Sequence, residues 1–159
     1  MKKKPSPFNP MEDIREFHQK FNLVYDGKPR GLPPELQSFR SLFLKEELRE
    51  YHLQVTHLGM TLAEQPDDAA GITYHLEGMV DGLVDLVYVA MGTAYLHGFD
   101  FEESWRRVHE ANMKKVRASS AEDSKRNSDQ DVVKPQGWEP PSHSDLVEDN
   151  AHRLPPSDT

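Results

Sequence analysis

Apolar residues recur at three- and four-residue spacing between residues 10 and 117, the pattern of helices that bury one face. The spacing predicts four helices, over 10–21, 34–58, 69–97 and 100–117, and no convincing strand. The third of these helices is apolar on nearly every side from Met79 to Met91, which is typical of a buried helix. The predicted fold class is therefore all-α, a four-helix bundle followed by an extended, mostly irregular C-terminal tail.

The apolar pattern is lost at both ends of the chain. Residues 1–9 indicate a flexible lead-in, and 118–159 indicate an extended tail beyond a helical domain at 10–117. The tail has too few apolar residues to offset its own ordering entropy, so we expect it to be disordered or docked on a folded part. Trp138, which lies between a glycine and a pair of prolines, favours docking of about 132–141.

Composition excludes several classes of protein. The chain has 159 residues, 36% of them hydrophobic, no cysteine and a formal net charge of −8. The lack of cysteine excludes disulfide scaffolds, thiolate nucleophiles and cysteine-based zinc sites. No uninterrupted apolar run reaches the roughly 18 residues of a membrane span, and none follows the basic start, so we expect a cytoplasmic protein without membrane association. An acidic chain repels nucleic-acid phosphates, so no nucleic-acid partner is expected.

One candidate for chemistry is an acidic trio in the second helix. Glu46, Glu47 and Glu50 project from neighbouring points of the helix surface, interspersed with Lys45 and Arg49. Taken alone, this trio is better explained by a solvated helix face with local ion pairs, and a functional site is the alternative.

A second candidate is a row of carboxylates in the apolar third helix, Glu77, Asp81 and Asp85, at four-residue steps. Like charges at this spacing repel one another and a buried carboxylate has a large desolvation cost, so the row needs a cation. Either basic side chains or a metal ion supplies it. Oxygen ligands without cysteine suit hard cations such as Mg²⁺ or Mn²⁺, which share coordination positions with substrate phosphates. Gly78 and Gly82 leave room for another helix or a ligand beside Asp81.

A third group is cationic. Asn112, Lys114 and Lys115 end the fourth predicted helix, and Lys134 precedes Trp138 in the tail. Compensation of the helix dipole explains Lys114 and Lys115 on its own, and binding of an anion is the alternative.

Taken together, these motifs resemble the MazG-like all-α nucleoside triphosphate pyrophosphohydrolases, in particular the short phage members. The matching motifs are Glu46-Glu47-x-x-Glu50, Asp81-x-x-x-Asp85-x-x-Tyr88, Asn112-x-x-Lys115 and Lys134-Pro135-x-Gly137-Trp138. The resemblance implies a four-helix MazG-like bundle that assembles into a homo-oligomer, a tetramer rather than a dimer. It also implies Mg²⁺ or Mn²⁺ as cofactor and hydrolysis of a nucleoside triphosphate to monophosphate and pyrophosphate.

The resemblance further assigns roles to individual residues. Glu47, Glu50 and Asp81 would be metal ligands, with Glu77 in place of the glutamate that the family has where this chain has Gly78. Glu46, Glu47 and Glu50 would be the catalytic carboxylates that orient the attacking water or accept its proton. The residues expected to bind substrate are Asn112, Lys115 and Lys134 at the phosphates, Asp85 and Tyr88 in support of the site, and Phe21, Asn22 and Trp138 at the base.

The likeness to the short phage members implies purine deoxynucleotides as substrates. The expected reaction is conversion of dGTP to dGMP, and also cleavage of dATP, for phage DNA that contains 2-aminoadenine. The alternatives are dUTP or dCTP, phosphoribosyl-ATP, and a non-catalytic helical interaction module. Residues 132–141 of the tail are expected to close over the nucleotide site.

Overall fold

The computed structural model describes residues 8–148, and these form two compact units, 8–99 and 100–148. The elements are α1 (Pro10–Lys20), α2 (Pro34–Glu64), α3 (Ala69–His97), α4 (Phe101–Met113), β1 (Val116–Arg117), β2 (Val132–Val133) and a 3-10 turn, η1 (Ser144–Leu146). The four predicted helices and the all-α class are confirmed. The prediction of no strand is wrong, because β1 and β2 form a short antiparallel pair of two residues each.

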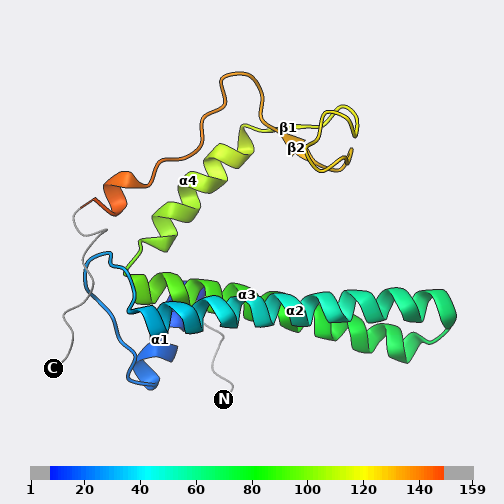
Figure 1. Ribbon diagram of the computed structural model, residues 1–159, viewed down its shortest axis with the longest axis horizontal. Helices are drawn as coiled ribbons and strands as arrows, with labels where there is room; N and C mark the ends of the chain where they lie inside the picture. Colours follow the sequence, from blue (N-terminus) through cyan, green and yellow to red (C-terminus); the bar gives the residue numbers. More distant parts are fainter. Residues whose placement is uncertain (1–7, 149–159) are drawn as a thin grey trace, which may run out of the picture. The chain divides into compact units, whose positions relative to one another are not determined.

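The first unit is built on an antiparallel hairpin of α2 and α3, the two longest helices (Figure 1). Between them Asp68 caps α3, because its side chain accepts a hydrogen bond from the Gly71 N–H at 3.0 Å. α2 extends six residues beyond its predicted end, through Gly59 to Glu64. A helical glycine costs only about 1 kcal/mol relative to alanine, which packing on α3 offsets.

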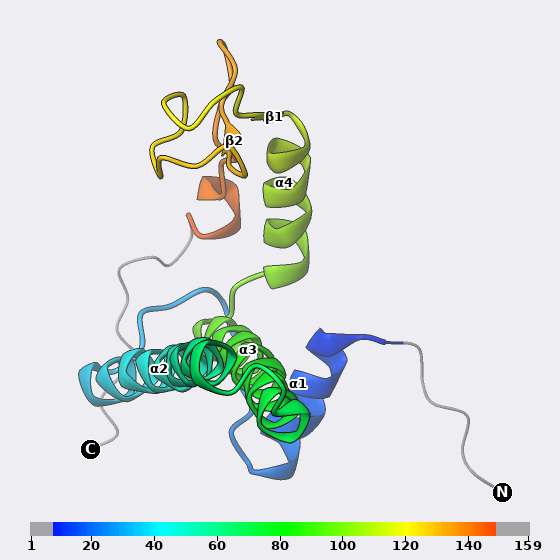
Figure 2. The ribbon, with the colours of Figure 1, turned by 90° about the vertical axis from the view of Figure 1, so that its right-hand side faces the viewer.

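α1 packs on α3 (Figure 2), and its Phe17 and His18 contact Tyr88 and Tyr95 in the C-terminal half of that helix. Ile14 is the one fully buried large side chain among the described residues, and His18 contacts the Tyr95 ring with centroids 4.5 Å apart. The loop that follows α1 is tied to the end of α3, since the Arg30 N–H donates to the His97 carbonyl at 2.9 Å. Gly98 ends α3 at φ 70°, and a Cβ there would lie 2.8 Å from the Gly27 carbonyl oxygen. This half of the hairpin therefore contains the core of the first unit.

The surface of the hairpin in a single chain is unusually apolar. Phe39 and Leu42 of α2 and Val80, Val84 and Val87 of α3 are each more than half exposed. The expectation that α3 is buried from Met79 to Met91 is therefore wrong for one protomer, because α1 covers only the C-terminal half of the helix. The acids Glu77, Asp81 and Asp85 are exposed with it.

α3 also has the length and composition of a membrane-crossing helix. Its mean hydropathy reaches 1.4 over 18 residues, of which 33% are buried in the protein. Our expectation of no membrane span counted uninterrupted apolar runs, and the acids of α3 interrupt its run. Length and composition alone are weak grounds for a span, since core helices of soluble proteins pass the same test.

The second unit contains α4 and the C-terminal segment up to Glu148. Trp138 Nε1 donates to the Ala111 carbonyl at 2.8 Å, and Arg107 forms a two-bond ion pair with Asp145, with Nη1–Oδ1 at 2.6 Å and Nη2–Oδ2 at 2.7 Å. The segment with Trp138 is thus docked on α4 by these two contacts. The boundary between compact units falls before α4 rather than at 117, because the tail packs on α4.

Candidate active site

Glu47 lies at the centre of a group of carboxylates. Only 8% of its surface is exposed, and burial raises the pKa of Glu47 above its ordinary value. The negative charges of Asp85, Glu50, Glu46 and Asp81 raise the pKa of Glu47 further, in that order of effect. The acids predicted on α2 and α3 therefore act on a single buried carboxyl.

A close approach of the two helices brings these acids together. A Cβ at Gly82 would lie 3.1 Å from the backbone nitrogen of Tyr51, and one at Gly78 would lie 2.8 Å from the side chain of Gln54. Both glycines thus admit α2, as expected from the sequence. With Gly82 set against Tyr51 in an antiparallel pair, Asp85 of α3 comes beside Glu47 of α2.

None of the six acids is neutralised by a basic side chain among residues 8–148. The ion pairs of this part of the chain involve other residues, and Lys45 and Arg49 pair with none of the neighbouring glutamates. The ion-pair interpretations of both acidic groups are thus not supported by the contacts. The buried carboxyl of Glu47 is left without a cation.

The acids do not form a complete coordination set in one chain. Within 8–148, no three acidic or histidine side chains converge closely enough to hold a metal ion. The donor chemistry nevertheless fits Mg²⁺ or Mn²⁺, because the group consists of carboxylates alone and contains an acid with a raised pKa that a cation would relieve. Glu47, Glu50, Asp81 and Asp85 are the residues that could hold the ion.

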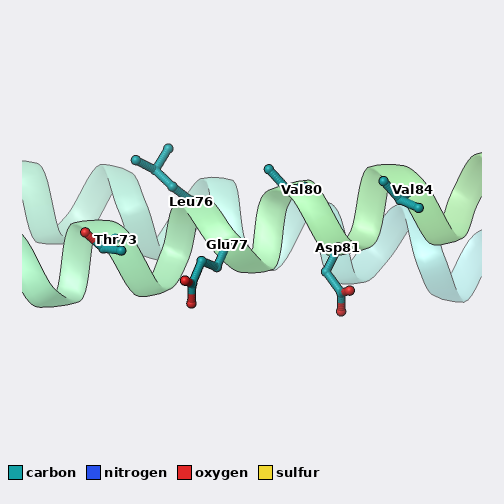
Figure 3. Close-up of a pocket in the computed structure, with 6 residues that line it drawn as sticks. All are labelled: Thr73, Leu76, Glu77, Val80, Asp81 and Val84. Carbon is teal, nitrogen blue, oxygen red and sulfur yellow. The ribbon is translucent and has the colours of Figure 1, made fainter. Parts of the chain in front are cut away.

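Glu77 lies away from Glu47. It lines a shallow concavity on α3, where it and Asp81 project from the same side of the helix (Figure 3). The other residues of this concavity are Thr73, Leu76, Val80 and Val84. Glu77 is absent from the charges that act on Glu47, whereas Asp85, one helical turn beyond Asp81, is foremost among them.

A deeper cavity of about 290 Å³ opens beside Glu47 and Asp85. Phe17 of α1 packs edge-on against Tyr88 with ring centroids 5.5 Å apart, and burial is the main cause that raises the pKa of Tyr88. The full lining is Phe17, His18, Arg40, Phe43, Glu47, Asp85, Tyr88, Val89 and Gly92. Carboxylates at one part and aromatic rings at another are the chemistry that a metal-bound nucleotide needs.

His18 and Arg40 were not predicted as site residues. Both are almost fully buried, at 2% and 9% exposed, and both border this cavity. His18 stands in the segment Phe17-His18-x-x-Phe21, which resembles the short phage members, but no site role was assigned to it, and the position of Arg40 in a charged helix gave no signal. The relevant signal is Gly92, because a Cβ there would lie 3.2 Å from each of these side chains.

The remaining predicted residues lie at the end of α1 and in the second unit. The Phe21 ring packs on Phe17 with centroids 4.7 Å apart, outside the cavity lining, and Asn22 follows with a positive φ of 57°. In the second unit, Lys134 Nζ lies 4.3 Å and Lys115 Nζ 5.6 Å from the centroid of the Trp138 ring. Asn112 is exposed in the last turn of α4.

The helical hairpin with its carboxylates and aromatic cavity defines a class, the all-α nucleotide pyrophosphohydrolases. The sequence model of the phosphoribosyl-ATP pyrophosphohydrolase family matches residues 14–112, and the chain belongs to this family, within the MazG-like superfamily. It is thus an enzyme, a nucleoside triphosphate pyrophosphohydrolase, and the interaction-module alternative is set aside. No individual curated protein matches the chain.

Proposed function

We propose that this protein is a metal-dependent pyrophosphohydrolase that cleaves a purine deoxynucleoside triphosphate to the monophosphate and pyrophosphate. The observation that carries the proposal is Glu47, a buried carboxyl among four other acids with no cation partner among residues 8–148. A divalent cation bound to a triphosphate supplies the missing positive charge.

The carboxylates hold the metal and position water. When bound, Mg²⁺ or Mn²⁺ neutralises the triphosphate and lowers the pKa of a coordinated water. Glu47 and Glu50 of α2 would hold the ion together with Asp81 of α3. Glu46, which lies beside them, would orient the attacking water or accept its proton.

Asp85 is a better fourth ligand than Glu77. Its charge acts on Glu47 more strongly than that of any other acid, and both residues line the same cavity. Glu77, in contrast, lines the concavity on α3 alone. We therefore assign Asp85 to the metal set, where the resemblance suggested only a supporting role.

The aromatic part of the cavity would take the base, and the resemblance assigns phosphate binding to Asn112, Lys115 and Lys134, which belong to the second unit. Phe17 and Tyr88 offer ring surfaces for stacking, with Phe21 and Asn22 at the rim of α1. Lys115 and Lys134 both lie over Trp138, and no carboxylate in the described part of the chain pairs with either. Together with Asn112 they would stabilise charge on the leaving pyrophosphate.

The purine preference and the biological setting come from the resemblance to the short phage members. The likeness extends to the purine deoxynucleotide enzyme MazZ, which converts dGTP to dGMP and also acts on dATP in phages with 2-aminoadenine DNA. The setting would then be the host cytoplasm. Phosphoribosyl-ATP is the second candidate substrate, because the matching family carries that name.

A substrate panel tests the proposal. The full chain is incubated with Mg²⁺ or Mn²⁺ and each of dGTP, dATP, dUTP, dCTP and phosphoribosyl-ATP, and release of pyrophosphate is measured. We expect turnover of dGTP and dATP that chelation abolishes, with Asp81→Asn inactive but equally helical. Turnover of phosphoribosyl-ATP or a pyrimidine alone would overturn the purine assignment. No pyrophosphate from any substrate would overturn the function.

A further inference from the structure

Arg40 is a buried cation with no counter-ion. Its side chain is 9% exposed, yet no carboxylate among residues 8–148 lies within ion-pair distance of it. A buried charge without a counter-ion is costly, and Nη1 of Arg40, which protein atoms do not fully enclose, is open to a partner in the cavity.

One edge of the guanidinium is already used for packing. Nε donates to Thr93 Oγ1 at 3.0 Å and Nη2 donates to the Val89 carbonyl at 2.7 Å, which holds the group against α3. Gly92 permits this approach, since a Cβ there would lie 3.2 Å from Nη2. Nη1 has no hydrogen-bond partner within 8–148, so the edge formed by Nη1 and Nη2 retains parallel N–H donors.

Along the α2–α3 groove, the cavity lining runs from the cation Arg40 to the acids Glu47 and Asp85. Arg40, Phe43 and Glu47 lie on one face of α2 at three- and four-residue steps, and all three line the cavity. Seven residues of helix separate Arg40 from Glu47, a rise of about 10 Å. This is roughly the length of a nucleoside. A nucleotide with its phosphates at Glu47 and Asp85 would therefore present its base to the aromatic rings and the far edge of that base to Arg40.

We propose that Arg40 determines base specificity by donating to the oxo edge of a 6-oxopurine. Guanine presents two adjacent acceptors, O6 and N7, which match the two parallel donors of the free guanidinium edge. Adenine presents an amino donor at the same place and leaves a buried N–H unpaired. Uracil offers a single oxo acceptor on the corresponding side. Arg40 thus favours guanine over both, and this inference rests on the proposed hydrolysis of purine deoxynucleotides.

The test compares substrates that differ only at the edge facing Arg40. The triphosphates of deoxyguanosine and deoxyinosine keep the 6-oxo group, whereas that of 2-aminopurine deoxyriboside lacks it. For the wild-type enzyme we expect kcat/KM to be about 10- to 100-fold higher on the two 6-oxopurines. In Arg40→Met the ratio should fall to near one, mainly through a raised KM for the 6-oxopurines. Arg40→Lys, which keeps the charge without the paired donors, should retain part of the ratio.

Thr93→Val is the matched control. It removes the Nε partner and the helix contact but leaves the free edge of Arg40, so the substrate ratio should persist even if the melting temperature falls. A wild-type enzyme that cleaves all three substrates equally, or an Arg40→Met enzyme that loses all three equally, would overturn the assignment. Preference for dUTP would do the same. No cleavage of any triphosphate would instead refute the proposed function, which keeps the two failures distinct. If Arg40→Met does not fold, the comparison of the three substrates with the wild-type enzyme still tests the proposal.

Discussion

Glu47 is an acid buried among other acids. Burial and the charges of Asp85, Glu50, Glu46 and Asp81 all raise the pKa of Glu47. The folded, metal-free protein therefore binds a proton at this position more readily than the unfolded chain, and the proposed divalent cation would compete for the same place. The charge repulsion that destabilises the metal-free protein would thus also favour binding of the proposed metal.

The raised pKa of Glu47 gives stability a definite pH dependence. A carboxyl whose pKa is raised on folding contributes stability at low pH, and the contribution is lost as pH rises above the ordinary value of 4.5 through the folded pKa. Glu47→Gln should remove this loss and raise the unfolding free energy of the metal-free protein at pH 7 relative to the wild type. Urea unfolding with chelator at pH 5 and pH 7 measures both. An equal change of unfolding free energy between pH 5 and pH 7 in the two proteins would contradict the raised pKa of Glu47.

Without metal, Glu47→Gln should be more stable than the wild type, and bound metal should reverse this order. Under the proposed function the ion would bind the folded state at Glu47, so Mg²⁺ or Mn²⁺ should raise the melting temperature of the wild type more than that of Glu47→Gln. Thermal melts with and without the ion measure this, with Ca²⁺-free chelated buffer as the reference. An equal rise in both proteins would place the ion elsewhere.

Substitutions at Asp85 and Glu77, both on α3, distinguish two alternative sets of metal ligands: one that includes Asp85 and one that includes Glu77. Asp85→Asn should lower kcat/KM at least about 100-fold, since Asp85 shares the cavity with Glu47. Glu77→Gln should lower it much less, because Glu77 lines only the concavity on α3. Steady-state assays across a Mn²⁺ titration compare them, with circular dichroism to check folding. The reverse order of losses would restore Glu77 to the metal set.

The register of the α2–α3 hairpin depends on glycine at one crossing. Gly82 faces the Tyr51 backbone, so a side chain there must push the helices apart and separate Glu47 from Asp85. Gly82→Val should destabilise by about 1–3 kcal/mol and reduce activity with it. Gly59→Ala, where nothing lies within 4 Å, should instead stabilise by about 0.5–1 kcal/mol. Urea denaturation measures the unfolding free energy of both variants. A change in the same direction relative to the wild type would refute the close approach of the helices at Gly82.

The hydrogen bond donated by Trp138 is one of the two contacts that dock the tail on α4. Trp138→Phe keeps an aromatic ring but loses the bond from Nε1 to the Ala111 carbonyl. Loss of about 1 kcal/mol should increase the undocked population about fivefold and speed proteolysis within 125–140 by the same factor. Trp105→Phe is the control, because Trp105 is 65% exposed and donates no hydrogen bond to any described residue. Equal rates for both variants would contradict docking through Trp138.

Helices of this chain are predictable from sequence because each has a strong local signal. Asp68 and Asp100 cap helices at the expected starts, and Gly98 ends α3 in the left-handed conformation. The pair β1–β2 gave no signal, since two residues are too short to alternate. Of the site, the two acidic groups were predictable by their spacing. The proximity of Glu47 and Asp85 depends on the register between α2 and α3. The burial of Arg40 depends on its contacts with Val89, Gly92 and Thr93 of α3. Neither is encoded locally.

A single protomer leaves its longest helices poorly covered, and this argues for a second copy. Leu76, Val80 and Val84 form an apolar stripe on α3 at four-residue steps, between 46% and 63% exposed. Exposed apolar surface of this extent marks an interaction face. Burial of a large apolar side chain contributes about 1.5–3 kcal/mol, so several such positions on each copy would stabilise an oligomer. The homo-oligomer implied by the resemblance, a tetramer, would cover this stripe.

Val80→Glu should therefore dissociate the protein. A carboxylate placed in the apolar stripe would have to be desolvated at the interface, and its repulsion from Glu77 and Asp81 on the same helix would add to that cost. Sedimentation equilibrium at micromolar concentration should show an oligomer for the wild type and a monomer for Val80→Glu, with a lower melting temperature for the variant. Gln37→Glu adds the same charge at an exposed polar position of α2 and should leave the assembly intact. A monomeric wild type with full activity, or an unchanged assembly in Val80→Glu, would show that the stripe on α3 is not covered by a second copy.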